Sequence, residues 1–476
     1  FKDTDNSGVF TWEPRPDAMP SGMDAAALNH TPLVLHNRFF SPKSPYTSRF
    51  EFLHGDDVAV PVDSGFWREL FGAPAQQWGM HTYEQDFLVT TFTKAAVLRS
   101  NMSAARTWLT LMDAAAQALN VSIQYCMALP RFILQSTAFP AVLSARASED
   151  YSPCGNAQWS YVPTNSILYD AVALAPFKDV FWSTSRVQAG NHWGDTCVEP
   201  DPELNLLISV LSAGSVAAGD RRGLLNATRL LQSCTAGGTL LKPDAPALPL
   251  PTVLTAAFRE TGAVHQPALF PIHAASRPDG GAGAYHFVLT TANQTTTQHI
   301  APSDMGDDPD AVLLALDYYA VIGAPSLPTA AANRAPKEVT LMVKASLVSE
   351  KMPLEIRPPR TSPVGDATPL SYFVLVPAPP SLSGPCWTLL GERAKLVSVG
   401  RLRFPRIERA GCGLRATVAG TAKEQVHVLV LRSAGAGRPI DGVRETLDGE
   451  VASIACELRG DGKAQLSCMA NECQCV

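Results

Sequence analysis

The sequence predicts an α/β protein in which a (β/α)8 TIM-type barrel is followed by an all-β sandwich region. Up to about residue 245, short apolar segments alternate with helical patterns, and polar and aromatic residues gather just after each apolar segment. This layout is typical of a barrel whose chemistry lies on loops at the carboxyl ends of parallel strands. Beyond that point, proline-rich turns and short alternating segments replace the helices, which indicates a β-sandwich.

Strands and helices alternate in the first part of the chain. Apolar residues recur at helical spacing from Ala104 to Leu119 and again from Leu204 to Leu211. The expected strands number about six rather than the eight of a complete barrel. They are residues 32–36, a strand at or just before 86–92, and residues 121–127, 141–145, 179–183 and 214–218.

The second part is expected to form strands at 285–289, 339–343, 372–376 and 426–431, with one helical pattern near 310–320. We therefore divide the chain into a barrel domain, residues 1–245, and a sandwich region, residues 246–476. The sandwich region can itself be divided into two subdomains, at about 246–380 and 381–476.

Composition excludes several classes of protein. Of the 476 residues, 46% are hydrophobic and 17% are charged, so the chain can bury a large core and is not disordered as a whole. The net charge of −6 predicts no nucleic-acid partner. The most apolar uncharged stretch, residues 204–219, is shorter than the roughly 20 residues that a membrane span needs, so no span is expected.

Cysteines and sequons predict the compartment. The ten cysteines suit disulfides and, together with five Asn-x-Ser/Thr sequons, predict a secreted or extracellular glycoprotein. The ten histidines include no pair at metal-binding spacing, so we expect no catalytic metal and no other cofactor. The predicted glycosylation sites are Asn29, Asn101, Asn120, Asn226 and Asn293.

Two acidic segments, 83–86 and 146–150, stand beside predicted strands. Taken alone, each could cap a helix or lie in a solvated loop. Their context resembles the raffinose synthase and α-galactosidase group of plants, which belongs to the α-galactosidase clan of glycoside hydrolases. The resemblance covers residues 121–245, and residues 368–403 are similar to the C-terminal β region of that group. The matching segments, in the same order, are 125–127, 146–153, 165–166, 177–183, 211–216 with Asp220, and 238–244.

The resemblance implies roles for two aspartates. In that clan the acid/base lies in an arginine-led segment after the sixth strand, which maps onto Asp150. The nucleophile ends the fourth strand and maps onto Asp86, but Glu84 replaces the lysine that normally precedes it by two residues. Retaining cleavage needs one ionised carboxylate to attack the anomeric carbon. A protonated carboxyl about 5–5.5 Å away must give its proton to the leaving oxygen.

Further residues near strand ends are candidates for binding the sugar. The aromatic ones could stack on a sugar face or instead belong to the core. Arg146 could orient Asp150 or a sugar hydroxyl, or instead form a structural ion pair with Glu149 or another carboxylate. The candidates are the aromatic residues Trp78, Tyr83, Trp182 and Trp193 and the polar residues His36, Asn37, Arg38, Arg146 and Asp220.

The resemblance also implies a disulfide and a gap in the barrel. Cys154 and Cys197 lie on adjacent loops of the expected face, so we expect them to be bonded. The third barrel strand maps onto residues 33–36, which places the first two strands upstream of Phe1. Because a barrel with open edges is unstable, we expect an N-terminal segment or a second chain to complete it.

We therefore expect a secreted retaining glycoside hydrolase acting on α-linked galactosides or related glycans. Transglycosylation is a variant in which a sugar hydroxyl replaces water. The alternative is a non-catalytic extracellular glycoprotein whose barrel binds carbohydrate or serves in structural assembly, because fold alone does not define function. A carboxylate pair well beyond catalytic distance would favour the alternative.

Overall fold

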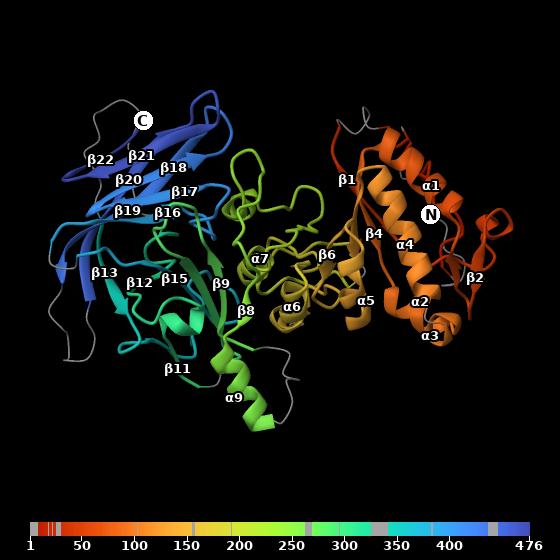
Figure 1. The fold of residues 1–476 in the computed structure, drawn as a ribbon, viewed down its shortest axis with the longest axis horizontal. Helices are drawn as coiled ribbons and strands as arrows, with labels where there is room; N and C mark the ends of the chain where they lie inside the picture. The colour runs from red at the N-terminus through yellow and green to blue at the C-terminus, as the bar shows by residue number, and fades with distance from the viewer. Residues whose placement is uncertain are drawn as a thin grey trace. The chain divides into compact units, whose positions relative to one another are not determined.

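The structure is a computed structural model, and its labelled elements are shown in Figure 1. It divides into two compact units, Phe1–Arg146 with Leu168–Pro176 and Ala147–Ile167 with Phe177–Val476. This division falls at Arg146 and not near residue 245, where the sequence texture changes. The residues that the structure describes are 8–17, 19–20, 22–24, 30–101, 103–154, 158–191, 193–261, 269–294, 296–324, 341–381, 384–436 and 446–476.

The first unit is built on a parallel sheet of five strands in the order β1-β4-β5-β6-β7. Four of them lie where apolar segments predict strands. The sheet is open, and no closed barrel is found in the part of the chain that the structure describes. The strands are β1 (Leu33–Asn37), β4 (Met80–Gln85), β5 (Ser122–Tyr125), β6 (Val142–Arg146) and β7 (Ala175–Phe177), which ends one residue into the second unit.

Two helices, α1 (Ser64–Ala73) and α4 (Ala104–Ala118), pack against each other and beside this sheet (Figure 1). Asp63 caps α1 by accepting a hydrogen bond from Gly65 N at 2.6 Å, which satisfies a backbone donor at the helix start. The predicted helical spacing in α4 buries one apolar stripe. The shorter elements are β2 (Phe52–His54), β3 (Ala59–Pro61), the π-helical turn η2 (Pro74–Trp78), α2 (Leu88–Lys94), α3 (Val97–Ser100) and α5 (Pro130–Gln135), and α6 (Val162–Ala171) spans the unit boundary.

The second unit is dominated by antiparallel sheets, as the sequence predicts for the C-terminal region. Nine strands follow the order β16-β19-β20-β13-β12-β15-β10-β9-β8, and four follow the order β17-β18-β21-β22. The first set is β8 (Leu248–Pro249), β9 (Ile272–Ser276), β10 (Tyr285–Thr291), β12 (Leu313–Asp317), β13 (Leu341–Val348), β15 (Leu370–Pro377), β16 (Trp387–Glu392), β19 (Gln425–Ala436) and β20 (Thr446–Glu457). The second set is β17 (Arg406–Ala410), β18 (Gly413–Ala419), β21 (Lys463–Met469) and β22 (Glu472–Cys475), with β11 (Gln298–Ile300) and β14 (Leu354–Ile356) as a separate pair.

Three local predictions differ from the structure. The helical pattern near 310–320 is wrong, because residues 313–317 form strand β12 between β13 and β15. The expected strands 179–183 and 214–218 form only an isolated parallel bridge between Phe181 and Ala218. The sandwich region also contains a helix, α9 (Pro251–Thr261), while α7 (Pro202–Leu211) agrees with the predicted helix and is followed by the short α8 (Ala227–Leu230).

Four disulfides link cysteines within the second unit. Cys154 is bonded to Cys197, which is the pairing expected from the resemblance. The others are Cys386–Cys412, Cys456–Cys475 and Cys468–Cys473, and Cys126 and Cys234 carry free thiols. Among the described residues, no helix combines the length and the apolar character needed to cross a membrane.

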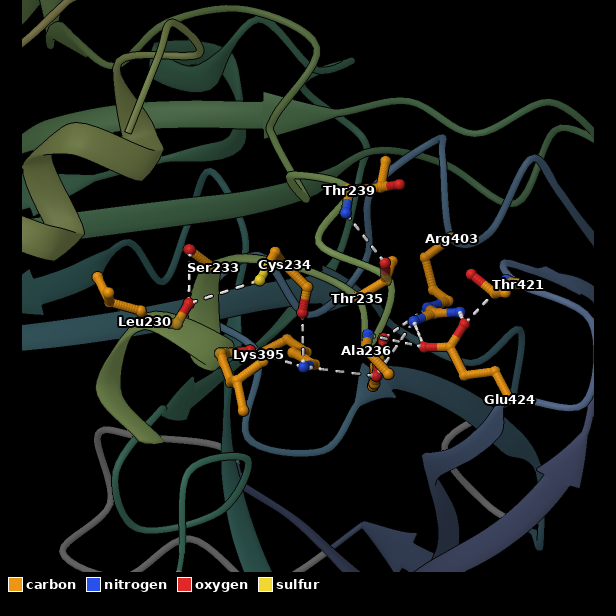
Figure 2. A network of polar contacts seen from close by, with 12 residues as sticks. Leu230, Ser233, Cys234, Thr235, Ala236, Thr239, Lys395, Arg403, Thr421 and Glu424 are labelled. Atoms are coloured by element: carbon orange, nitrogen blue, oxygen red, sulfur yellow. Dashed lines mark hydrogen bonds and ion pairs between the residues drawn. The ribbon is translucent and has the colours of Figure 1, made fainter. Parts of the chain in front are cut away.

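A buried ionic network ties the loop at residues 230–239 to the β region (Figure 2). Arg403 is fully buried and donates to Glu392 Oε2 at 2.6 Å and to Glu424 Oε1 at 2.7 Å. Glu424 also accepts from Ala236 N at 3.1 Å, and Lys395 Nζ donates to the Cys234 carbonyl at 2.7 Å. The loop is therefore fixed mainly through its backbone.

Candidate functional site

Polar side chains from neighbouring strands gather on one face of the parallel sheet, at its carboxyl edge. The register aligns His36 with Glu84, and Glu84 with Gln124. Side chains alternate between the two faces of a strand, so residues two positions apart share a face. Asp86 therefore follows Glu84 on this face, and Cys126 follows Gln124. Strand β6 contributes Arg146, whose charge acts on His36, Glu84 and Cys126.

Asp86, at this edge of the sheet, has three hydrogen-bond partners. Its Oδ2 lies 3.0 Å from His36 Nε2, its Oδ1 accepts from Phe87 N at 2.6 Å, and the Cys126 thiol hydrogen-bonds to it. Burial raises the pKa of Asp86, but these three donors outweigh burial, and the net pKa is lowered. The carboxylate is therefore held ionised, while 12% of its side chain stays exposed.

The pKa values of His36 and Glu84, the two titratable neighbours of Asp86, are raised rather than lowered. Burial lowers the pKa of His36, but the hydrogen bond to Asp86 and the charges of Glu84 and Asp86 raise it above its usual value. Burial also raises the pKa of Glu84, and the neighbouring charge of Asp86 raises it further. Glu84 on β4 and Asp86 just beyond its end thus have pKa values moved in opposite directions, a pattern found in sites that use one ionised and one protonated carboxyl.

The backbone turns sharply just beyond the strand ends. Phe87 follows Asp86 with φ 56°, and Met127 follows Cys126 with φ 48°. Both are non-glycine residues whose backbone lies in the left-handed region. Residues other than glycine rarely adopt this region, and doing so costs of order 1 kcal/mol for each residue. Val89 N donates to Met127 O at 3.0 Å and connects the two turns. Such strain is concentrated at functional sites, and here it lies beside Asp86 and Cys126.

The opposite face of the sheet belongs to the core, which is one of the two alternatives that the sequence leaves open for Tyr83. Tyr83 is fully buried, accepts a hydrogen bond from Asn37 Nδ2 at 2.8 Å and donates to Gln85 Oε1 at 3.0 Å. Its ring centroid lies 4.7 Å from that of Phe71 on α1. Tyr83 and the equally buried Asn37 are therefore bonded to each other within the core of the first unit. Arg38 lies over the Phe87 ring at 5.2 Å, which supports the turn after Asp86.

A hollow of about 260 Å³ opens beside His36. Trp78, a predicted sugar-stacking residue, lines it together with Trp12. Sequence reasoning missed Trp12 because it lies in no predicted strand or helix and far from the strand ends along the chain. The adjacent Glu13-Pro14-Arg15 segment, with its charges and proline next to an indole, is a weak signal for a binding loop.

Asp150, the predicted acid/base, lies in the second unit and is solvent-exposed. The next residue is well anchored: Tyr151 N donates to Asp179 Oδ2 at 2.8 Å, and Tyr151 Oη donates to Glu199 Oε2 at 2.7 Å. Burial raises the pKa of Glu199 to about 7. The pairing of Asp86 with Asp150 stays a prediction.

Two other predicted binding residues of the second unit have structural roles. Trp182 is buried, its backbone N–H donates to Tyr151 Oη, and its ring meets those of Tyr151 and Trp193 edge-on. Asp220 accepts from Ser183 N at 2.9 Å and from Gln188 Nε2 at 3.1 Å, so it holds two loops together. Trp182 therefore belongs to the core, which is one of its two alternatives, and sugar binding by Asp220 stays a prediction.

The asparagines of the predicted glycosylation sites differ in their exposure to solvent. Asn101, Asn120 and Asn293 are exposed, whereas Asn226 is half-buried and accepts from Arg229 N at the start of α8. Asn29 lies outside the described residues. Their glycosylation remains a prediction.

Neither a search for metal ligands nor a comparison with known proteins assigns a function to the site. Among the described residues, no group of three or more His, Cys, Asp or Glu side chains could hold a metal ion. No protein-family model matches the chain, and no curated protein matches it.

Proposed function

We propose that the chain is a retaining glycoside hydrolase of the α-galactosidase clan, with Asp86 as its nucleophile. The observation that carries the proposal is the Asp86 site itself. A partly exposed carboxylate is held ionised by His36, Cys126 and the Phe87 N–H at the carboxyl edge of a parallel sheet. Catalytic groups of α/β proteins commonly lie at this edge.

The proposed reaction has two steps. The Asp86 carboxylate attacks the anomeric carbon of an α-linked galactoside, and the bond to the leaving oxygen breaks as that oxygen receives a proton. The covalent glycosyl ester is then cleaved by water, or by a sugar hydroxyl in transglycosylation. His36 remains bonded to Asp86 Oδ2 and keeps this nucleophile anionic before attack. The resemblance to the α-galactosidase clan implies that Asp150 is the proton donor.

The fold proposal follows the same resemblance. We infer that the five parallel strands are part of a (β/α)8 barrel. Within this sheet the strands lie in their order along the chain, with the separate β2–β3 pair inserted between β1 and β4, and such a sequential order is that of barrel strands. The four disulfides are compatible with a secreted protein, which is the compartment that we propose.

A labelling experiment tests the nucleophile. A fluorinated galactosyl donor that forms the ester quickly and hydrolyses it slowly is expected to add one sugar to the peptide carrying Asp86, as measured by mass spectrometry. Asp86→Asn should abolish labelling and lower kcat/KM by at least about a hundredfold. Asp57→Asn is a matched control, because Asp57 is exposed on the same unit. Labelling at another carboxylate would overturn the assignment.

The acid/base assignment is tested by changing the leaving group. Dinitrophenol departs without a proton, whereas an alkyl alcohol needs one. Asp150→Asn should therefore leave kcat/KM for the dinitrophenyl galactoside nearly unchanged and lower it about a hundredfold for the alkyl galactoside. Equal effects on both substrates would remove Asp150 from this role.

The non-catalytic alternative is favoured by one observation, the exposure of Asp150. In that case the protein would bind galactosides without cleaving them. Detectable binding of an oligosaccharide with no labelling and no hydrolysis would establish this alternative.

A further inference from the structure

A pair of tryptophans forms an aromatic wall on the first unit. The ring centroids of Trp12 and Trp78 lie 6.4 Å apart, with 48° between the ring planes. Trp12 is fixed from two sides, because its Nε1 donates to His36 O at 3.1 Å and its ring meets Tyr83 edge-on at 5.8 Å. Trp78 is only half-buried, so part of its ring remains accessible to a ligand.

Two hollows share this wall. The first, of about 260 Å³, and the second, of about 170 Å³, both include Trp12, Trp78 and Glu13 in their lining. Each also contains polar groups of its own. These are Arg15 and His36 in the first hollow, and Tyr46 and Glu69 in the second.

This combination suits a sugar better than an apolar ligand. A pyranose ring has a C–H face that can lie on an indole and a rim of hydroxyl groups that need hydrogen-bond partners. Glu13, Arg15 and His36 can supply such partners. A wholly apolar ligand would bury these groups without replacing their hydrogen bonds to water, which costs free energy.

We propose that the two hollows bind successive pyranose rings of an oligosaccharide. His36 links the first hollow to the proposed nucleophile, because it lines this hollow and its Nε2 lies 3.0 Å from Asp86 Oδ2. The substrate class is therefore an oligosaccharide chain and not a single galactose unit. The identity of the reacting bond rests on the proposed function, whereas the binding of the rings does not.

Calorimetry on the full-length Asp86→Asn variant tests the proposal without turnover. The probes are α-linked galacto-oligosaccharides of one to four rings. Affinity is expected to rise at least about tenfold from one ring to the longest probe, which corresponds to about 1.4 kcal/mol. Adding Trp78→Ala should remove this gain, and adding Trp12→Phe should reduce it. Phe258→Ala is the control, because Phe258 is an exposed aromatic residue on α9.

The outcomes separate the subsites from the proposed activity. Affinity that does not depend on chain length, or a gain that survives Trp78→Ala in a protein that melts like its parent, overturns the two subsites. Tighter binding of phenol than of any sugar probe also overturns them. If the parent protein hydrolyses no galactoside but the Trp78-dependent gain is present, the subsites stand and the proposed hydrolase falls. If the parent protein hydrolyses galactosides but its affinity does not rise with chain length, the proposed hydrolase stands and the subsites fall.

Discussion

His36 and Asp86 form a hydrogen-bonded pair across two neighbouring parallel strands, with Nε2 3.0 Å from Oδ2. The pair links the proposed nucleophile to the first hollow, because His36 contacts Asp86 and also lines that hollow. Its electrostatic effect is reciprocal: burial opposes charge on both groups, yet the pKa of Asp86 is lowered and the pKa of His36 is raised.

Replacement of His36 should change the acid limb of the pH profile. His36→Ala removes one of the three donors to Asp86, so the pKa of Asp86 should rise and the acid limb of kcat/KM should move to higher pH. His36→Gln retains an N–H donor and should shift the limb less. The same order is expected in a carbon-13 NMR titration of the carboxyl group, which does not require activity. An unchanged Asp86 titration in His36→Ala would contradict the pairing.

Glu199 should make the second unit less stable as the pH rises. Burial raises its pKa from 4.5 to about 7, so between these values the folded state binds a proton that the unfolded state has lost. The stabilisation is therefore full below pH 4.5 and is lost as the pH rises toward 7. Glu199→Gln removes this titration. The melting temperature of the variant minus that of the parent should increase from pH 5 to pH 8, and a constant difference would refute the effect.

The Arg403 network should be the most sensitive polar cluster of the β region. Arg403→Met leaves Glu392 and Glu424 buried without their cation, which is expected to cost about 3–5 kcal/mol of unfolding free energy in urea denaturation. Arg406→Met is the matched control, since Arg406 pairs with Glu408 on the exposed side of β17 and such pairs contribute about 0–1 kcal/mol. Equal losses in the two variants would show that burial does not set the difference.

The sequence predicted the first sheet well because its signals are local. The helical stripe of α4 and the apolar segments of β1, β5 and β6 each lie within a single element. It failed at β12, where Leu313 to Leu316 are all buried between two strands, so alternation between polar and apolar residues is lost. The division at Arg146 depends on contacts between segments distant in the chain, which a change of sequence texture does not record.

The candidate site shows the same limit. The sequence left Tyr83 open between core and sugar stacking, and alternation along β4 favours the core, because Tyr83 is one position from Glu84 and so faces the other way. Trp12 could not be assigned, since its place beside His36 depends on a hydrogen bond across 24 residues.

The cross-linked C-terminus has a practical consequence for producing the protein. Strand β22 is joined by Cys473 to β21 and by Cys475 to β20, so its attachment depends on thiol oxidation as well as on strand pairing. Expression in a reducing bacterial cytosol would leave both links unformed. A host with an oxidising folding compartment, and an affinity tag placed away from Val476, would give material in which these links can be mapped by peptide analysis.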